Sequence, residues 1–128
     1  MSTTSVFRAD TIDALRHQLG DAGGDVVAEL IGLYLVQGGE LVGEIEAAGA
    51  APDPIQLRAA AHKLKGSTAT LGGDRLAAVC QRIEVAPPAE LDVGGTTVEV
   101  RREFELLAGE LTRYRSSIPP TPGPTQAV

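Results

Sequence analysis

The spacing of apolar residues predicts two helices in the first half of the chain. Ile12, Leu15 and Leu19 share one face of a short helix that Asp10 or Thr11 can cap and that a glycine cluster after residue 19 ends. A longer helix is predicted from about residue 25 to 48, where apolar side chains keep the helical period. These apolar positions are Val27, Leu30, Ile31, Tyr34, Leu41, Val42 and Ile45. Internal glycines each cost about 1 kcal/mol relative to alanine in a helix, so the pattern allows a kink near Gly38–Gly39.

Three further helices are predicted in the second half. One runs from Pro54 to about Leu71, and a tight turn at residues 72–74 follows it, with Asp74 available as the cap of the next helix. That next helix ends before Pro87–Pro88. Residues 86–97 are expected to form a loop, since a lone β-prone "TTVEV" has no partner strand, and the last helix is predicted over 98–117. The inward stripes of the three helices are Leu57, Ala61, Leu64, Thr68 and Leu71; Leu76, Val79, Cys80 and Ile83; and Phe104, Leu107, Leu111 and Tyr114.

The predicted elements define an all-α fold. The simplest arrangement is an antiparallel four-helix bundle with a short extra N-terminal helix, because short turns place consecutive helices side by side. We divide the chain into a flexible N-terminus over residues 1–9, a bundle over residues 10–117 and a tail over residues 118–128. The "PPTPGPT" of the tail is typical of a disordered segment or a linker.

Composition narrows the functional classes. The chain has 128 residues, 3% aromatic residues and no Trp, so one core of Leu, Val, Ile and Ala is expected. A net charge of −6 argues against general nucleic-acid binding. The uninterrupted apolar runs are too short to cross a bilayer, and "MSTTSVFRAD" lacks the features of a signal peptide. A single cysteine, Cys80, fits a reducing compartment and a place in the core. We therefore expect a cytoplasmic monomer.

The stretch "AAAHKLKGSTATLGG" contains His62, the histidine with a distinctive context, whereas His17 has none and is expected to be an idle surface residue. The inward stripe includes Ala61, and each helical residue turns about 100°, which places His62 toward solvent. Lys65 and Gly66 follow at the spacings that share its face. Because glycine is costly in mid-helix, Gly66 indicates either that space above the ring stays open or that another helix packs closely there.

The turn at Gly72–Gly73 identifies a partner for this histidine. In an antiparallel hairpin, residues equally far from the turn lie side by side; His62 is eleven positions before Gly73 and Glu84 eleven after it. A carboxylate that accepts from Nδ1–H fixes the tautomer and leaves the Nε2 lone pair free, although Glu84 could equally form a surface salt bridge. With Lys65 to counter the charge of a phosphoryl group, these residues predict a histidine nucleophile rather than a metal ligand.

The segment "AAAHKLKGSTATLGGDRLAAVCQRIE" resembles the histidine-containing phosphotransfer (Hpt) domain of multistep two-component phosphorelays. The resemblance covers about residues 10–115 and includes the upstream "ELIGLYL"; the sequence departs from the family in its glycine-rich second helix and its long loop before the last helix. The matching features are His62, Lys65 and Gly66 as H-x-x-K-G, then Ser67, Leu71 and Gly72, followed by Leu76, Cys80, Ile83 and Glu84.

The resemblance implies a phosphoryl carrier without catalytic activity of its own. His62 would be phosphorylated on Nε2, Glu84 would hold Nδ1, and Lys65 would lie beside the phosphoryl group. The implied partners are response-regulator receiver domains or a hybrid sensor histidine kinase. Mg²⁺ would come from the receiver's acidic pocket, since this cationic site offers no oxygen cluster and needs no cofactor. The alternatives are a phosphoacceptor module of a larger chemotaxis-type histidine kinase and an adaptor that binds receivers without taking phosphate.

Further residues around His62 are candidates for support or docking. Ile55 and Ala59 would offer a small apolar docking surface, and Arg58 a basic rim, unless its guanidinium is merely solvated. Lys63 is either a second cation for the site or a plain surface charge. Ser67 either supports the phosphoryl site or bonds back to its own helix.

Overall fold

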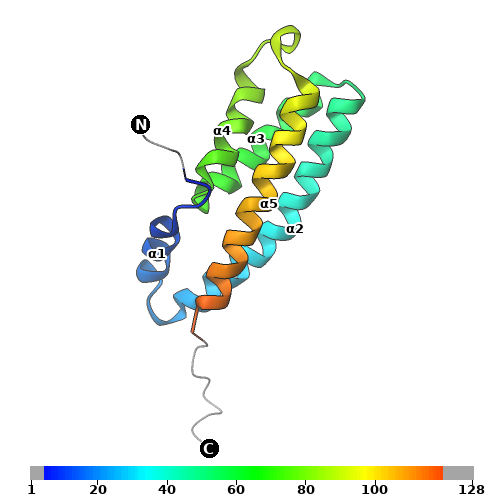
Figure 1. The fold of residues 1–128 in the computed structure, drawn as a ribbon. Coiled ribbons are helices and arrows are strands. Elements are labelled where there is room, and N and C mark those ends of the chain that lie inside the picture. The colour runs from blue at the N-terminus through cyan, green and yellow to red at the C-terminus, as the bar shows by residue number, and fades with distance from the viewer. Residues whose placement is uncertain (1–4, 120–128) are drawn as a thin grey trace, which may run out of the picture.

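The computed structural model describes residues 5–119 and is all-α, as the apolar spacing predicted, with no strand among these residues. Figure 1 shows the elements in chain order. They are α1 (Ala9–Gln18), the 3₁₀ turn η1 (Gly20–Ala22), α2 (Gly23–Ala50), α3 (Pro54–Thr70), α4 (Asp74–Val85), the 3₁₀ turn η2 (Pro88–Glu90) and α5 (Val93–Ser117). The predicted and observed bounds of α3 differ by one residue. The predicted cap of α1 was wrong: the helix begins at Ala9 with Arg8 as its N-cap, so Asp10 and Thr11 lie inside its first turn.

The helices enclose one aliphatic core. α2 packs against α3 and α5, and α4 packs against the same two helices from the other side (Figure 1). The short helix α1 contacts α2. The residues that are completely buried are nearly all Ile, Leu and Val, as expected from the scarcity of aromatic residues. They include Ile12, Val27, Ile31, Val42, Ile45, Leu64, Ile83, Val100, Leu107 and Leu111.

A short connection makes α3 and α4 a hairpin. The side chain of Asp53 accepts a hydrogen bond from Gln56 N at 3.1 Å, which caps α3 at its start. After the helix, Gly72 adopts a φ of +82°, which favours glycine. The expected capping role of Asp74 was wrong: Gly73 is the N-cap of α4 and Asp74 is its first residue. The Asp74 carboxylate instead forms an ion pair with Arg8.

The start of α5 departs from the prediction. The helix begins at Val93 rather than at residue 98, so the predicted loop over residues 86–97 is shorter, and it contains the 3₁₀ turn η2. Asp92 accepts a hydrogen bond from Gly95 N at 3.2 Å and thereby caps the helix. The first turn then packs closely on α2, where a Cβ at Gly49 would lie 3.0 Å from the Val93 and Thr97 side chains. Tertiary packing thus overrides the local β propensity of "TTVEV".

α2 is a continuous helix through both Gly38 and Gly39, so these glycines do not end it. It also begins earlier than predicted, at Gly23, a residue that we had expected to end the preceding helix. A Cβ at this position would lie 2.2 Å from the carbonyl oxygen of Arg16, so only glycine allows this close approach of α1 and α2. Gly23, Gly38 and Gly49 of α2 are therefore packing positions, whereas a Cβ at Gly43 would meet nothing within 4 Å.

The helical stretch Gly20–Ala50 is, by length and composition alone, apolar enough to cross a membrane, which corrects the expectation from uninterrupted apolar runs. The same test is passed by core helices of soluble proteins, so this is weak evidence for a span. In the structure one face of α2, which includes Val27, Ile31 and Val42, is buried in the core.

Both ends of the described chain contact the bundle. Val6 and Phe7 pack against the core, and the Phe7 ring meets the Tyr114 ring edge-on with 5.7 Å between centroids. Ile118, just after α5, also packs against the core. Residues 1–4 and 120–128, which hold much of the predicted flexible N-terminus and most of the predicted tail, lie outside the described residues.

Candidate functional site

His62 projects from α3 into solvent. Its neighbours Ala61 and Leu64 are fully buried, whereas 71% of the His62 side chain is exposed, which confirms the predicted orientation. One turn later, a Cβ built on Gly66 would have no atom within 4 Å. Close packing of a neighbouring helix therefore does not explain this glycine, and the space beside the imidazole is open.

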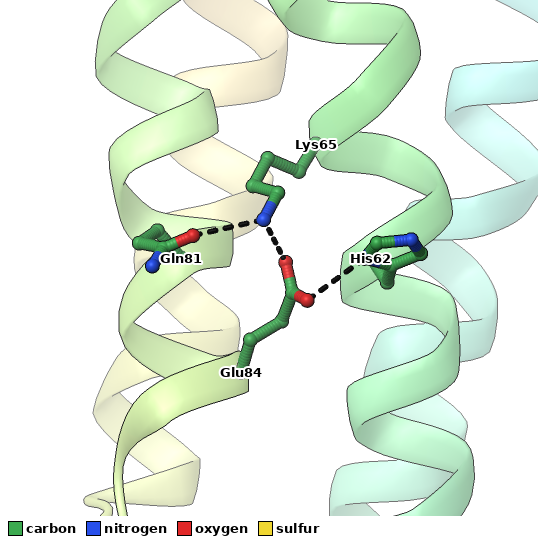
Figure 2. A network of polar contacts seen from close by, with 4 residues as sticks. All are labelled: His62, Lys65, Gln81 and Glu84. Atoms are coloured by element: carbon green, nitrogen blue, oxygen red, sulfur yellow. Dashed lines mark hydrogen bonds and ion pairs between the residues drawn. The ribbon is translucent and has the colours of Figure 1, made fainter.

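Glu84 reaches His62 across the α3–α4 hairpin. Its Oε2 lies 2.8 Å from His62 Nδ1, as the position of the turn predicted (Figure 2). An ionised carboxylate can only accept a hydrogen bond, so this contact puts the imidazole hydrogen on Nδ1. Nε2 on the opposite edge of the ring then carries the free lone pair, and the exposed ring can present it to a partner.

Lys65 lies on the Glu84 side of the histidine. Its Nζ forms an ion pair with Glu84 Oε1 at 2.7 Å (Figure 2). The same nitrogen donates a hydrogen bond to Gln81 Oε1 at 2.8 Å. We had expected this ammonium beside Nε2. In the structure it is bound to α4 instead, because two acceptors one turn apart on that helix face it. The contact with Lys65, followed by that with His62, holds the pKa of the Glu84 carboxyl below its ordinary value, against the opposing effect of burial.

Gln81 is the residue of this network that our sequence reasoning missed, although the same count from the turn locates it. Lys65 is eight positions before Gly73 and Gln81 is eight positions after it. The two pairs of side chains, Lys65 with Gln81 and His62 with Glu84, therefore occupy successive levels of one hairpin.

The supporting candidates divide into free and engaged side chains. Ile55, Ala59 and Lys63 are exposed, and the side chain of Ile55 is the most exposed large apolar group, at 82%. Arg58, by contrast, donates from Nη2 to the carbonyl oxygen of Ala86 at 3.2 Å, which ties it to the end of α4. The basic rim that we expected from Arg58 is therefore engaged in the fold.

Ser67 bonds back to its own helix, one of the two alternatives left by the sequence. Its hydroxyl donates to the carbonyl oxygens of Lys63 and Leu64 at 3.4 and 3.3 Å.

Cys80 is fully buried under the site, and burial raises the pKa of its thiol to about 12, so it is inert core packing. His17 is exposed on α1, away from this network. Over residues 5–119, no cluster of His, Cys, Asp and Glu could hold a metal ion.

The arrangement suits nucleophilic attack by Nε2. One face of the ring is open at Gly66, the tautomer is set from the opposite edge by Glu84, and the nearest cation is already neutralised by that carboxylate. Such a site can take up an electrophilic group from a partner that approaches the exposed side of α3.

A comparison of the sequence with models of known protein families identifies the family of this chain. The Hpt domain model matches residues 29–116, which include every member of the His62 network, and the chain belongs to this family of histidine-containing phosphotransfer domains. Hpt domains are phosphoryl carriers of phosphorelays, without an ATP-binding catalytic domain, and they interact with receiver domains.

Among solved structures, the chain resembles histidine-containing phosphotransfer protein B (HptB) from Pseudomonas aeruginosa PAO1. The TM-score is 0.77 at 22% sequence identity, and the alignment covers 89% of this chain and 97% of that one. This likeness shows a shared fold. Comparison with curated proteins gives no match.

Proposed function

We propose that His62 accepts a phosphoryl group from the aspartyl phosphate of a receiver domain and passes it to the aspartate of another. The observation that carries the proposal is the contact of 2.8 Å between Glu84 Oε2 and His62 Nδ1 on a side chain that is 71% exposed. It leaves Nε2 unprotonated and accessible, as a phosphoryl acceptor must be.

The transfer needs no proton to leave the site. The Nε2 lone pair attacks phosphorus, the bond from phosphorus to the aspartyl oxygen breaks, and the aspartate leaves as a carboxylate. The ring keeps the hydrogen on Nδ1 and gains positive charge, which the Glu84 carboxylate stabilises through the hydrogen bond already present. The reverse attack by a second aspartate releases the neutral ring in the same tautomer.

The receiver supplies the remaining chemistry in this proposal. Mg²⁺ belongs to its acidic pocket, and its surface meets the exposed sides of α2 and α3 around His62, where Ile55 and Ala59 are free to contact it. We further infer an antiparallel four-helix bundle that acts as a cytoplasmic monomer. The single buried Cys80 agrees with a reducing compartment.

Transfer from a labelled receiver is the direct test. Wild-type protein mixed with a ³²P-labelled receiver domain should acquire an acid-labile, alkali-stable phosphate, and His62→Gln should acquire none. Labelling that survives this substitution, or no labelling with any of a panel of receivers, would contradict the proposal. A receiver that binds the protein without transfer would favour the adaptor function instead.

ATP distinguishes the carrier from a module of a kinase. Wild-type protein with ATP and Mg²⁺ alone should remain unlabelled, since a carrier has no nucleotide site of its own. Labelling by ATP without any other protein would indicate an autokinase. Labelling that appears when a separate chemotaxis-type kinase catalytic domain is added, but not with phosphorylated receivers, would favour the phosphoacceptor module.

A further inference from the structure

Gln81 anchors the lysine of the His62 site. Its amide oxygen lies 2.8 Å from Lys65 Nζ, and Glu84, one helical turn further along α4, lies 2.7 Å from the same nitrogen (Figure 2). The ammonium is therefore shared by two acceptors of one helix and links α3 to α4. Only 29% of the lysine side chain is exposed, which is low for a residue of this type on a helix surface.

The carboxylate between Lys65 and His62 needs this anchor. Oε2 of Glu84 contacts the exposed imidazole, whereas Oε1 is buried and lies 2.7 Å from Lys65 Nζ. The ion pair with Lys65 is what compensates the burial of Oε1. A lone surface ion pair is weak because a lysine chain has many rotamers, and a second acceptor such as Gln81 reduces that freedom.

We propose that Gln81 and Lys65 are positioning residues that hold the Glu84 carboxylate against Nδ1 of His62 and so keep Nε2 free for phosphoryl transfer. The order of contacts is Gln81 to Lys65, Lys65 to Glu84, and Glu84 to His62. In the unphosphorylated protein Lys65 thus acts through Glu84, on the edge of the ring opposite to the reacting nitrogen. The consequence for the transfer rate rests on the proposed function, whereas the consequence for the tautomer does not.

The tautomer of His62 is the first test, by ¹⁵N-detected NMR of the imidazole at pH about 8, where an ordinary histidine is neutral. The wild-type ring should carry its hydrogen on Nδ1. Gln81→Met keeps length and helix propensity but removes the acceptor, and Lys65→Met removes the cation. Both should shift the population toward the Nε2–H form, Lys65→Met further than Gln81→Met. Gln81→Glu, which keeps an acceptor for Lys65, should restore the Nδ1–H form.

A matched control separates positioning from general destabilisation. Gln18→Met changes an exposed glutamine at the end of α1 and should leave the His62 tautomer unchanged. A wild-type tautomer in Gln81→Met would overturn the role of Gln81, and one in Lys65→Met would overturn that of Lys65. This readout needs no receiver, so it remains decisive even if the phosphotransfer function fails.

Transfer rates provide the second test. Gln81→Met should slow uptake from a phosphorylated receiver about three- to tenfold, the size of effect expected for one typical hydrogen bond. Glu84→Ala should fold and slow transfer more strongly. In the Glu84→Ala background, Gln81→Met should have no further effect, because the two residues act through one path. Additive losses would mean that Gln81 acts elsewhere, and faster transfer in Gln81→Met would mean that freeing Lys65 helps and that the lysine acts on the phosphoryl group.

Discussion

Gly38 in α2 and Gly66 in α3 are both interior helical glycines, yet their surroundings differ completely. A Cβ at Gly38 would lie 2.8 Å from Phe104 Cε1 and 3.3 Å from Tyr34 Cζ, inside the packed core between α2 and α5. A Cβ at Gly66 would meet nothing within 4 Å. Glycine is equally unfavourable for helix propensity at both sites, so different benefits must offset that cost.

The core around Gly38 uses glycine to bring two helices together. The Phe104 ring of α5 occupies the volume that a side chain at Gly38 would fill, and it tilts against the Tyr34 ring at 5.9 Å between centroids. The Tyr34 hydroxyl is in turn bonded to the Thr68 hydroxyl of α3 at 2.7 Å. This region is closed and holds the scaffold on which α3 presents His62.

The surface around Gly66 uses glycine to keep volume empty. Nothing in the protein occupies the space beside the imidazole, so a partner that approaches His62 can enter it. The comparison teaches that a mid-helix glycine signals a constraint on space, while only its neighbours show whether that space is already occupied. The predictions below test this division between a packing glycine and a clearance glycine.

The largest effect is expected for Gly38→Val. Both branches of valine would overlap the Phe104 and Tyr34 rings, and overpacking of this kind should lower the free energy of unfolding by about 3 kcal/mol or more, measured by urea denaturation. The matched variant Gly66→Val adds the same atoms to open space and should remain as stable as the wild type. Equal stability of Gly38→Val and Gly66→Val would contradict the distinction between a packing glycine and a clearance glycine.

Gly66→Gln should reduce phosphotransfer without changing the stability of the fold, in contrast to Gly38→Val. The side chain would occupy the space beside His62, so phosphotransfer should fall about tenfold or more, which corresponds to ~1.4 kcal/mol in the transition state. The helical circular dichroism and the Tm should stay close to wild type. Ala78→Gln, on the exposed face of α4 beside α5, is the control and should change neither. Normal transfer in Gly66→Gln would disprove clearance, and a strongly lowered Tm would assign Gly66 to packing.

Gly66→Ala should stabilise the fold slightly, whereas Gly38→Val destabilises it. Alanine at an open helical position gains up to about 1 kcal/mol of stability through better helix propensity. The same substitution at Gly38 should be destabilising, because the overlap with Phe104 outweighs that gain. Thermal unfolding followed by circular dichroism would show the two shifts in Tm, and a gain at both positions would show that Phe104 can move aside.

The smallest effect concerns pH and distinguishes the charged surface from the core. The pKa of Glu84 is lowered in the folded protein, so its carboxylate stabilises the fold above the ordinary carboxyl value of 4.5, and this contribution disappears as the pH falls through the lowered value. The difference in unfolding free energy between wild type and Glu84→Gln should shrink as the pH falls below about 4.5. The difference in unfolding free energy between wild type and Gly38→Ala should not show this dependence on pH. A Glu84 difference that is insensitive to acid would mean that its ion pair contributes nothing to the fold.

Much of the fold followed from local signals along the chain. Apolar spacing located all five helices, and capping and proline signals at Asp53 and Pro54 marked the start of α3 closely. The start of α5 was missed although Asp92 is a local cap signal, because the packing of Val93 and Thr97 at Gly49 of α2 is distant in sequence. The continuity of α2 was equally invisible, since a glycine that fits an aromatic ring looks the same in sequence as one that permits a kink.

The sequence by itself determined the exposed histidine and the carboxylate that contacts its Nδ1. His62, Gly66 and Glu84 lie on regular helices on either side of a two-glycine turn, and helix geometry then fixes which side chains face one another. Only the tertiary structure decided where the flexible cation goes. Lys65 can reach either edge of the imidazole, and its choice depends on the acceptors Gln81 and Glu84 that α4 presents together. A long charged side chain extends toward the acceptors that attract it electrostatically, and these acceptors come together only when the helices have packed.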